Sequence, residues 1–109
     1  MNLGEKQREF ARLIGLFISH AYASGYQLTL GDAYRDPRVT YGHPKSVHRS
    51  RLAVDFNLFE NRSGVWVYRI DTESWRPLGE WWEKQHELAR WGGRFSDGNH
   101  LSLEHEGVK

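Results

Sequence analysis

The strongest structural signal in this chain is the stretch Ser46-Val47-His48-Arg49-Ser50-Arg51-Leu52-Ala53-Val54-Asp55-Phe56-Asn57-Leu58-Phe59. Its second half alternates between apolar residues and small or polar ones, which predicts a β-strand over Leu52–Phe59 with one face in the core. The predicted core face carries Leu52, Val54, Phe56 and Leu58. The opposite face is small and polar enough to leave room for a ligand. It carries Ala53, Asp55, Asn57 and Phe59.

His48 and Asp55 are the chemically reactive residues of this stretch and stand seven positions apart. Seven is odd, so on one straight strand their side chains would face opposite sides of the sheet. They can meet only if the chain bends between them, and Arg49-Ser50-Arg51 is polar enough to form that bend. A lone His–Asp pair is more typical of a surface hydrogen bond than of a metal site, so the metal hypothesis needs a third ligand.

Length and composition indicate one compact domain over residues 1–109. The five Trp, five Tyr and five Phe can build its core. A net charge of +1 argues against a nucleic-acid partner, and the absence of Cys excludes disulfides, Cys zinc fingers and Cys nucleophiles. We expect no membrane span and no signal peptide, and therefore synthesis in the cytoplasm.

The flanking segments predict further elements. Apolar residues at three- and four-residue steps predict a helix over about 5–24, which Gly25 would end. A strand is predicted over Tyr26–Asp32, a turn over Glu60–Gly64, and another strand over Val65–Ile70 that could form a hairpin with Leu52–Phe59.

The C-terminal part of the chain predicts a second helix and a last strand. Helix caps are available at Asp71–Ser74, Pro77 fits the first turn, and the helical pattern ends near Trp91. The Trp residues of this helix are expected in the core. His100–His105 alternates as a strand, with His100, Ser102 and Glu104 on one face and Leu101, Leu103 and His105 on the other.

These elements place three possible ligands for a catalytic zinc, which requires three protein ligands and one open position. We expect one zinc per chain, bound by His48, Asp55 and His100, which would acidify its water and polarise a substrate carbonyl. Asp97 would serve as the general base, and Arg35 would bind a substrate carboxylate or stabilise the oxyanion. Two alternatives remain open: Glu104 as the base and His105 as the ligand.

The spacing of these residues resembles a known family. Ser46-x-His48, Ala53 and Asp55 are similar to the Ser-x-His-x-x-Gly-x-Ala-x-Asp motif, although Arg51 stands where the motif has Gly. That motif belongs to the VanY-like zinc D-alanyl-D-alanine carboxypeptidases and the related phage L-alanyl-D-glutamate endopeptidases. Asp97-x-x-His100 resembles the family's acidic-x-x-His motif, and Trp91–Phe95 resembles the Trp-Gly-Gly segment of the phage members.

The resemblance implies an α+β fold, with helices packed on a short antiparallel sheet that carries the zinc site. It implies a zinc peptidase of peptidoglycan stem peptides, with Arg35 and Ser46 in substrate binding. Within that class we expect a monomeric phage endolysin, made in the host bacterium and acting on the cell wall, that cuts the L-Ala–D-Glu bond. A D-alanyl-D-alanine carboxypeptidase and a non-catalytic, zinc-stabilised wall-binding module are the alternatives. A metal-dependent nuclease is disfavoured by the near-neutral charge.

Overall fold

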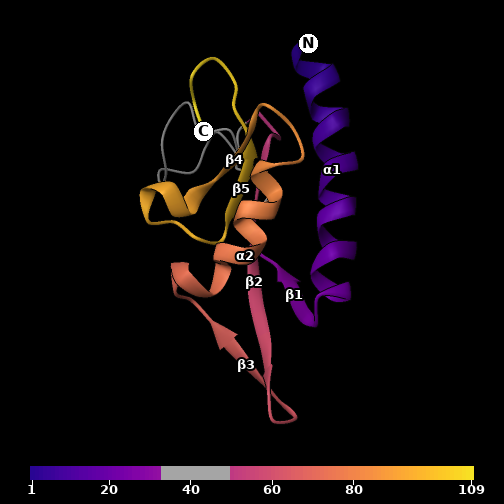
Figure 1. Ribbon diagram of the computed structural model, residues 1–109. Helices are drawn as coiled ribbons and strands as arrows, with labels where there is room; N and C mark the ends of the chain where they lie inside the picture. The colour runs from indigo at the N-terminus through magenta and orange to yellow at the C-terminus, as the bar shows by residue number, and fades with distance from the viewer. Residues whose placement is uncertain (33–49) are drawn as a thin grey trace.

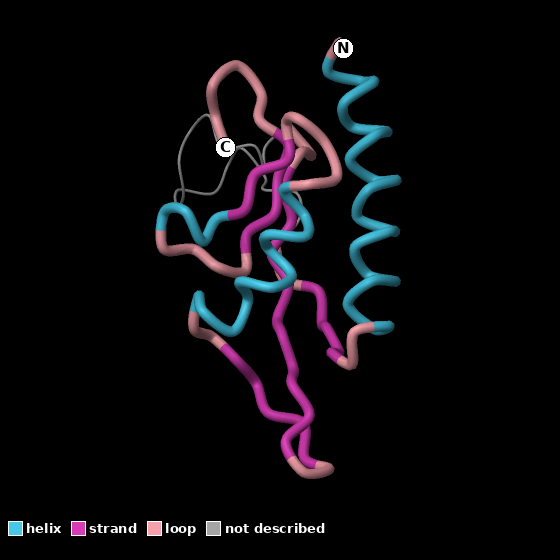
Figure 2. Tube along the Cα trace, viewed as in Figure 1, coloured by secondary structure: helices cyan, strands magenta, loops and turns pink. Residues whose placement is uncertain are grey.

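A computed structural model describes residues 1–32 and 50–109 of the chain. Within these described residues, eight elements follow one another in this order: α1 (Leu3–Ala23), β1 (Tyr26–Leu30), β2 (Ala53–Arg62), β3 (Val65–Arg69), α2 (Thr72–Glu83), β4 (Ala89–Trp91), the 3₁₀ helix η1 (Gly92–Phe95) and β5 (His100–Leu103). Figures 1 and 2 show the two helices beside a long, twisted sheet, with the β2–β3 hairpin extending away from the rest of the molecule.

The strand β2 is the centre of a five-stranded sheet with the order β1-β2-β5-β4. β1 pairs with β2 on one side; on the other side β5 pairs with its first residues and β3 with its last. Every one of these pairings is antiparallel. Two helices on an antiparallel sheet confirm the predicted α+β class, and the predicted strand over Leu52–Phe59 is confirmed as β2.

Both helices contribute aromatic side chains to one core. Phe17 of α1 is fully buried, and its ring lies 5.5 Å from that of Phe56 and 6.2 Å from those of Trp75 and Trp82. Phe56 belongs to the β2 face that was predicted to be apolar, and Trp75 and Trp82 belong to α2. Because these large rings exclude water from both sides of the helix–sheet interface, they supply much of the hydrophobic stabilisation. The expectation that the Trp residues of α2 lie in the core is confirmed for these two.

The ends of α1 follow from its sequence. The Asn2 side chain accepts a hydrogen bond from the Glu5 amide and the Glu5 carboxylate accepts one from the Asn2 amide, which is a capping box. At the other end Gly25 adopts a φ of +91°, the left-handed conformation that glycine reaches without a steric penalty. The prediction that Gly25 ends the helix is therefore confirmed.

The prediction for the second helix was wrong at its C-terminal end. α2 begins after an Asp71 cap, as expected, but it ends at Glu83, and Pro77 is its sixth residue rather than part of the first turn. Ala89–Trp91, which fitted the helical period, instead forms β4 opposite Leu103–Leu101. Pairing with β5 satisfies the backbone of this segment and buries Trp91 completely, and this tertiary gain outweighs a weak local helical preference.

The hairpin turn and the last strand are both shorter than predicted. The turn predicted over Glu60–Gly64 is confined to Ser63 and Gly64, whose φ values of 54° and 87° are those of a type I′ hairpin turn. Pairing with β3 extends β2 to Arg62. At the C-terminus, β5 stops at Leu103, and His105 pairs only with Val108 in an isolated bridge.

The predicted bend before β2 is visible at Ser50 and Arg51, which form a turn. Arg51 has a φ of 57°, a left-handed conformation that costs an L-residue about 1–2 kcal/mol. This is the position at which the family motif has Gly. We therefore expect Arg51→Gly to be more stable to urea than Arg51→Ala by about 1 kcal/mol, because both variants lose the same side chain and only Gly relieves the backbone. Equal stability of the two variants would contradict this.

Candidate functional site

The sheet register places Asp55 directly opposite His100. Asp55 is the third residue of β2 and His100 the first of β5, and the two are register partners. The main chain of Asp55 is also held from the other side, since its carbonyl accepts from the Gly31 amide at 2.8 Å and its amide donates to the Asp32 carbonyl at 2.6 Å. These two hydrogen bonds, together with the one that the neighbouring Phe56 amide donates to the Asn99 carbonyl at 3.1 Å, hold Asp55 on a rigid part of the fold.

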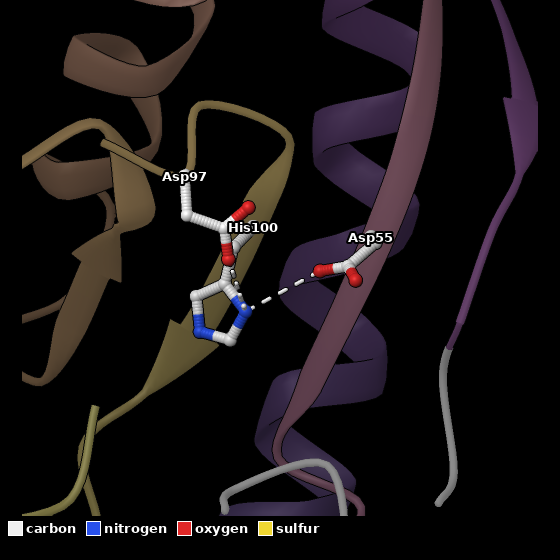
Figure 3. Close-up of side chains that lie close together, drawn as sticks. All are labelled: Asp55, Asp97 and His100. Carbon is white, nitrogen blue, oxygen red and sulfur yellow. Dashed lines mark ion pairs between the residues drawn. The ribbon is translucent and has the colours of Figure 1, made fainter. Parts of the chain in front are cut away.

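A second carboxylate reaches the same place from the turn before β5. Figure 3 shows Asp55, Asp97 and His100 pointing toward one another. The His100 Nδ1 atom lies 3.3 Å from Asp55 Oδ1 and 4.0 Å from Asp97 Oδ2. The three ligand atoms are all within 4.8 Å of one another. His100 is buried, with 5% of its surface exposed, whereas half of the Asp97 side chain faces solvent.

The other ring nitrogen of His100 indicates which atom is available to a cation. Nε2 lies 3.1 Å from the carbonyl oxygen of Lys109. A carbonyl oxygen only accepts, so Nε2 must carry the proton and donate it. In the neutral imidazole the Nδ1 lone pair then faces the two carboxylates. Positive charge between groups this close is stabilising, and a bound metal ion could supply it.

The donor set fits zinc. Imidazole nitrogen and carboxylate oxygen are both ordinary zinc ligands, and tetrahedral bonds of about 2.0–2.1 Å place neighbouring ligand atoms about 3.3 Å apart. The Nδ1–Oδ1 distance of 3.3 Å has that value. A hydrogen bond from Nε2 to a backbone carbonyl is also the usual way to orient a metal-binding His. Asp55 and His100 could thus hold a metal, with Asp97 either beside it or among its ligands.

The other residues singled out in the sequence do not join this group in the described structure. Arg35, Ser46 and His48 lie outside the described residues. Glu104, the alternative base, forms an ion pair with Arg90 at 3.3 Å. His105, the alternative ligand, has its Nδ1 atom 3.2 Å from Lys6 Nζ on α1. Within the described part of the chain, the group that could bind a metal therefore contains His100 and Asp97 but neither alternative.

Comparison with known protein families identifies the family of the chain. The profile of a D-alanyl-D-alanine carboxypeptidase family matches residues 40–103, which is more than half of the chain. The chain belongs to this family. The matched region contains Ser46, His48 and the Asp55–Asp97–His100 group, whereas Arg35 precedes it. A search of curated proteins found no match.

Family membership makes the protein a metallopeptidase that acts on peptidoglycan or on D-Ala-D-Ala peptides. The suspected VanY-like relationship is thereby confirmed. Across residues 1–32 and 50–109, neither helix is both long and apolar enough to cross a membrane. An apolar cavity of about 390 Å³ between α1 and the start of β2 is lined by residues such as Phe10, Ile14 and Val54, and none of the three clustered residues lines it. The candidate metal site of Asp55, Asp97 and His100 therefore lies on the sheet and outside that cavity.

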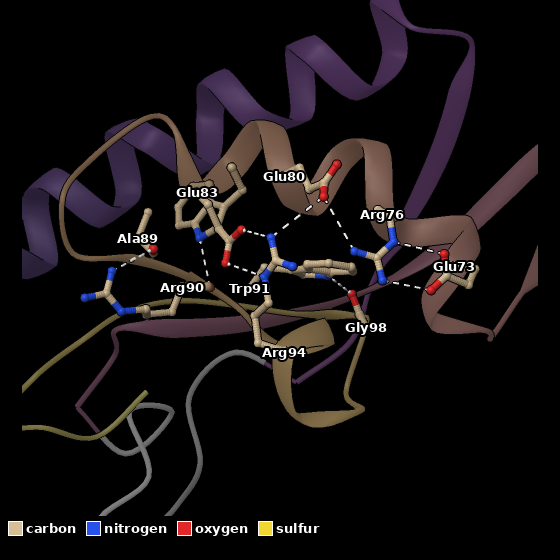
Figure 4. A network of polar contacts seen from close by, with 10 residues as sticks. Glu73, Arg76, Glu80, Glu83, Ala89, Arg90, Trp91, Arg94 and Gly98 are labelled. Carbon is tan, nitrogen blue, oxygen red and sulfur yellow. Dashed lines mark hydrogen bonds and ion pairs between the residues drawn. The ribbon is translucent and has the colours of Figure 1, made fainter.

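Trp91 supports the turn that carries Asp97. Its indole Nε1 donates to the carbonyl oxygen of Gly98 at 2.7 Å, and the whole residue is buried. The guanidinium carbons of Arg76 and Arg94 each lie 5.3 Å from the centroid of its ring, and Figure 4 shows the carboxylates that bind these two arginines. Cation–π contacts and ion pairs on one side, and a buried hydrogen bond on the other, fix the loop between η1 and β5.

Gly92 has no room for a side chain beside the cluster. A Cβ atom at this position would overlap the Asp97 carbonyl oxygen and lie 2.6 Å from His100 Cβ. We expect Gly92→Ala to lower the free energy of unfolding by about 1–3 kcal/mol, because overpacking forces the backbone to shift. Urea denaturation monitored by Trp fluorescence measures this.

Gly15 offers the matched control for Gly92. It lies in α1, and a Cβ atom there would have no heavy atom within 4 Å. Gly15→Ala should raise the stability of the peptidase by up to about 1 kcal/mol, since Ala is the better helix former. A loss of stability in Gly15→Ala as large as that in Gly92→Ala would show that the effect is not specific to the cluster.

Phe95 is a residue at this site that the sequence analysis did not single out. Its ring centroid lies 5.7 Å from that of His100, and nearly half of its surface (48%) is exposed. The sequence contained a signal for Phe95, because this residue ends the Trp91–Phe95 segment that resembles the phage members of the family. An exposed ring beside the buried imidazole gives the peptidase an apolar wall at the edge of its site.

Proposed function

We propose that this metallopeptidase is a zinc-dependent peptidoglycan endopeptidase that hydrolyses the bond between L-Ala and D-Glu of stem peptides. The observation that carries the proposal is the close approach of Asp55, Asp97 and His100 on one sheet, inside the region matched by the family. An imidazole and a carboxylate at 3.3 Å with a second, exposed carboxylate beside them are what zinc-assisted hydrolysis needs.

His48, Asp55 and His100 would hold the zinc, one ion per chain. Zinc, when bound, supplies polarisation of the scissile carbonyl and a lower pKa for water. The protein supplies the positions of its ligands. Asp55 and His100 are held by the β2–β5 pairing, and His100 is further oriented by the Lys109 carbonyl.

Asp97 would take the proton from the attacking water and pass it to the leaving amine. Its side chain is half exposed and lies 4.0 Å from His100 Nδ1, farther than Asp55. A base must reach both the water and the substrate nitrogen, so a position at the open edge of the cluster suits this role. The Trp91–Gly98 hydrogen bond would keep Asp97 at that edge.

Arg35 and Ser46 would bind the substrate, following the resemblance to the family. A guanidinium pairs with a carboxylate through two parallel hydrogen bonds, and stem peptides carry several carboxylates. We place the enzyme among phage endolysins because Trp91-Gly92-Gly93 resembles their segment.

Digestion of purified sacculi tests the bond. We expect mass analysis to find released peptides that begin with D-Glu, and L-Ala left on the glycan. Release of D-Ala alone, with no soluble peptide, would instead establish the D-alanyl-D-alanine carboxypeptidase alternative, which the description of the matched family favours. Binding to sacculi without any cleavage would favour a non-catalytic wall-binding module.

A further inference from the structure

The sheet face that carries Asp55 continues along the hairpin as a row of aromatic and amide side chains. Asp55, Asn57 and Phe59 share a face because they alternate along β2. Register partners lie on the same face, so Thr29 joins opposite Asn57, Tyr68 opposite Phe59 and Trp66 opposite Asn61. We call the set Thr29, Asn57, Phe59, Trp66 and Tyr68 the hairpin platform.

Two of the three aromatic residues of the hairpin platform are exposed to solvent. Tyr68 is 52% exposed and Trp66 is 41% exposed, whereas Phe56 and Leu58 on the opposite face of β2 are buried in the core. Figure 1 shows that the hairpin extends away from both helices. Two large aromatic residues exposed on the same face of a hairpin are typical of contact surfaces.

Hydrogen bonds and one ring contact link Thr29, Asn57, Phe59 and Tyr68 of the hairpin platform. The Tyr68 hydroxyl donates to Asn57 Oδ1 at 3.2 Å, and Asn57 Nδ2 donates to Thr29 Oγ1 at 3.1 Å. The rings of Phe59 and Tyr68 lie 5.5 Å apart at an angle of 33°. A ring that is already oriented loses little side-chain entropy when a ligand stacks on it, so the platform is preorganised for binding.

The composition of the hairpin platform matches a sugar better than a peptide or an anion. Its five side chains are aromatic, amide or hydroxyl, and none carries a formal charge. The C–H face of a pyranose packs on aromatic rings, while its hydroxyl and acetamido groups need amide and hydroxyl partners. The glycan of peptidoglycan consists of N-acetylated amino sugars with both features.

The distance along β2 between Asp55 and the hairpin platform also fits a glycan strand attached to the stem peptide. Phe59 is four residues beyond Asp55, which is about 13 Å along a strand. For a cut after L-Ala, one amino acid and the lactyl ether separate the scissile bond from the first sugar, which is about 7 Å of extended chain. A sugar ring attached there would therefore lie over Asn57 and Tyr68, and the next ring toward Trp66.

We infer that the hairpin platform binds the glycan strand of peptidoglycan and aligns the attached stem peptide with Asp55 and His100. This inference rests on the proposed peptidase function. It makes the β2–β3 hairpin a substrate subsite separate from the group of Asp55, Asp97 and His100.

The test compares two substrates, a disaccharide-linked stem peptide and the same peptide without the sugar. For each variant one measures the ratio of kcat/KM on the sugar-linked peptide to kcat/KM on the free peptide. Trp66→Ala and Tyr68→Ala should each lower this ratio about three- to tenfold relative to the unmodified protein, the loss expected for one aromatic stacking contact. Because the ratio cancels the fraction of active enzyme, partial misfolding of a variant cannot imitate the result.

Two further variants provide the controls. Tyr68→Phe keeps the ring and should retain most of the ratio. Val65→Ala, an exposed residue on the opposite face of the same hairpin, should leave the ratio unchanged. An unchanged ratio in both Trp66→Ala and Tyr68→Ala would overturn the inference, and dimerisation that Trp66→Ala abolishes would then assign this face to a second copy of the chain. Failure of the unmodified protein to cleave either substrate would overturn the proposed function instead.

Discussion

His100→Ala is expected to abolish zinc retention and to lower the melting temperature by roughly 10 °C or more. The imidazole is buried opposite Asp55, with Nδ1 at 3.3 Å from that carboxylate, so its removal takes away a proposed ligand of the zinc. Bound metal at about a hundred times its Kd stabilises a protein by about 2.7 kcal/mol, and this contribution would disappear. Elemental analysis and thermal unfolding with and without added zinc measure both effects.

His105→Ala is the matched control for His100→Ala. His105 is directed toward Lys6 of α1, and removing it should leave the zinc content unchanged. If His105→Ala lost zinc while His100→Ala kept it, the third ligand would be His105, and the cluster of Asp55, Asp97 and His100 would not be the metal site.

Asp97→Asn is expected to reduce kcat on the order of a hundredfold or more while the protein keeps its fold and its zinc. The amide has nearly the shape of the carboxylate, but it cannot accept a proton from water. The side chain is half exposed, so the substitution should cost little stability. Turnover of a soluble stem peptide, together with elemental analysis of the same sample, separates loss of the base from loss of the metal.

Glu104→Gln tests the competing assignment of the base. Glu104 forms an ion pair with Arg90, and both side chains are about one-quarter exposed. Breaking this pair should change stability slightly and leave kcat near that of the unmodified protein. The role of base would pass to Glu104 if Glu104→Gln were inactive and Asp97→Asn active. Loss of zinc in Asp97→Asn would instead make Asp97 a ligand.

Local sequence patterns predicted the elements of this fold well where the pattern had one meaning. The alternation over Leu52–Phe59 predicted β2 and its buried face, because a period of two is incompatible with a helix. Gly25 and Asp71 act through a φ angle and a hydrogen bond within a few residues, so their effects on α1 and α2 could be predicted from the chain. The Asn2 cap was missed, and α1 begins two residues before the predicted start. The pattern failed at Ala89–Trp91, where a short apolar run fits either a helix or a strand.

The sequence analysis named Asp55, Asp97 and His100 as candidates from residue type and spacing. The sequence does not predict that Asp55 and His100 are register partners across β2 and β5, because this pairing depends on hydrogen bonds between segments far apart in sequence. The support from Trp91 to the Gly98 carbonyl, and the close approach of Gly92 to the cluster, are equally non-local.

The sequence alone established the direction in which each side chain of β2 faces and the types of ligand available, because these depend on local periodicity and on chemistry. The class of the fold was implied by the resemblance of its motifs to a known family. The tertiary structure decided which of those ligands meet. β2 can pair with β1, β3 and β5 at once only in one register, and that register sets Asp55 against His100 and aligns Asn57 and Phe59 with Thr29 and Tyr68. A shift of one residue would turn every one of these side chains to the other face of the sheet, where the aromatic core leaves no room for them.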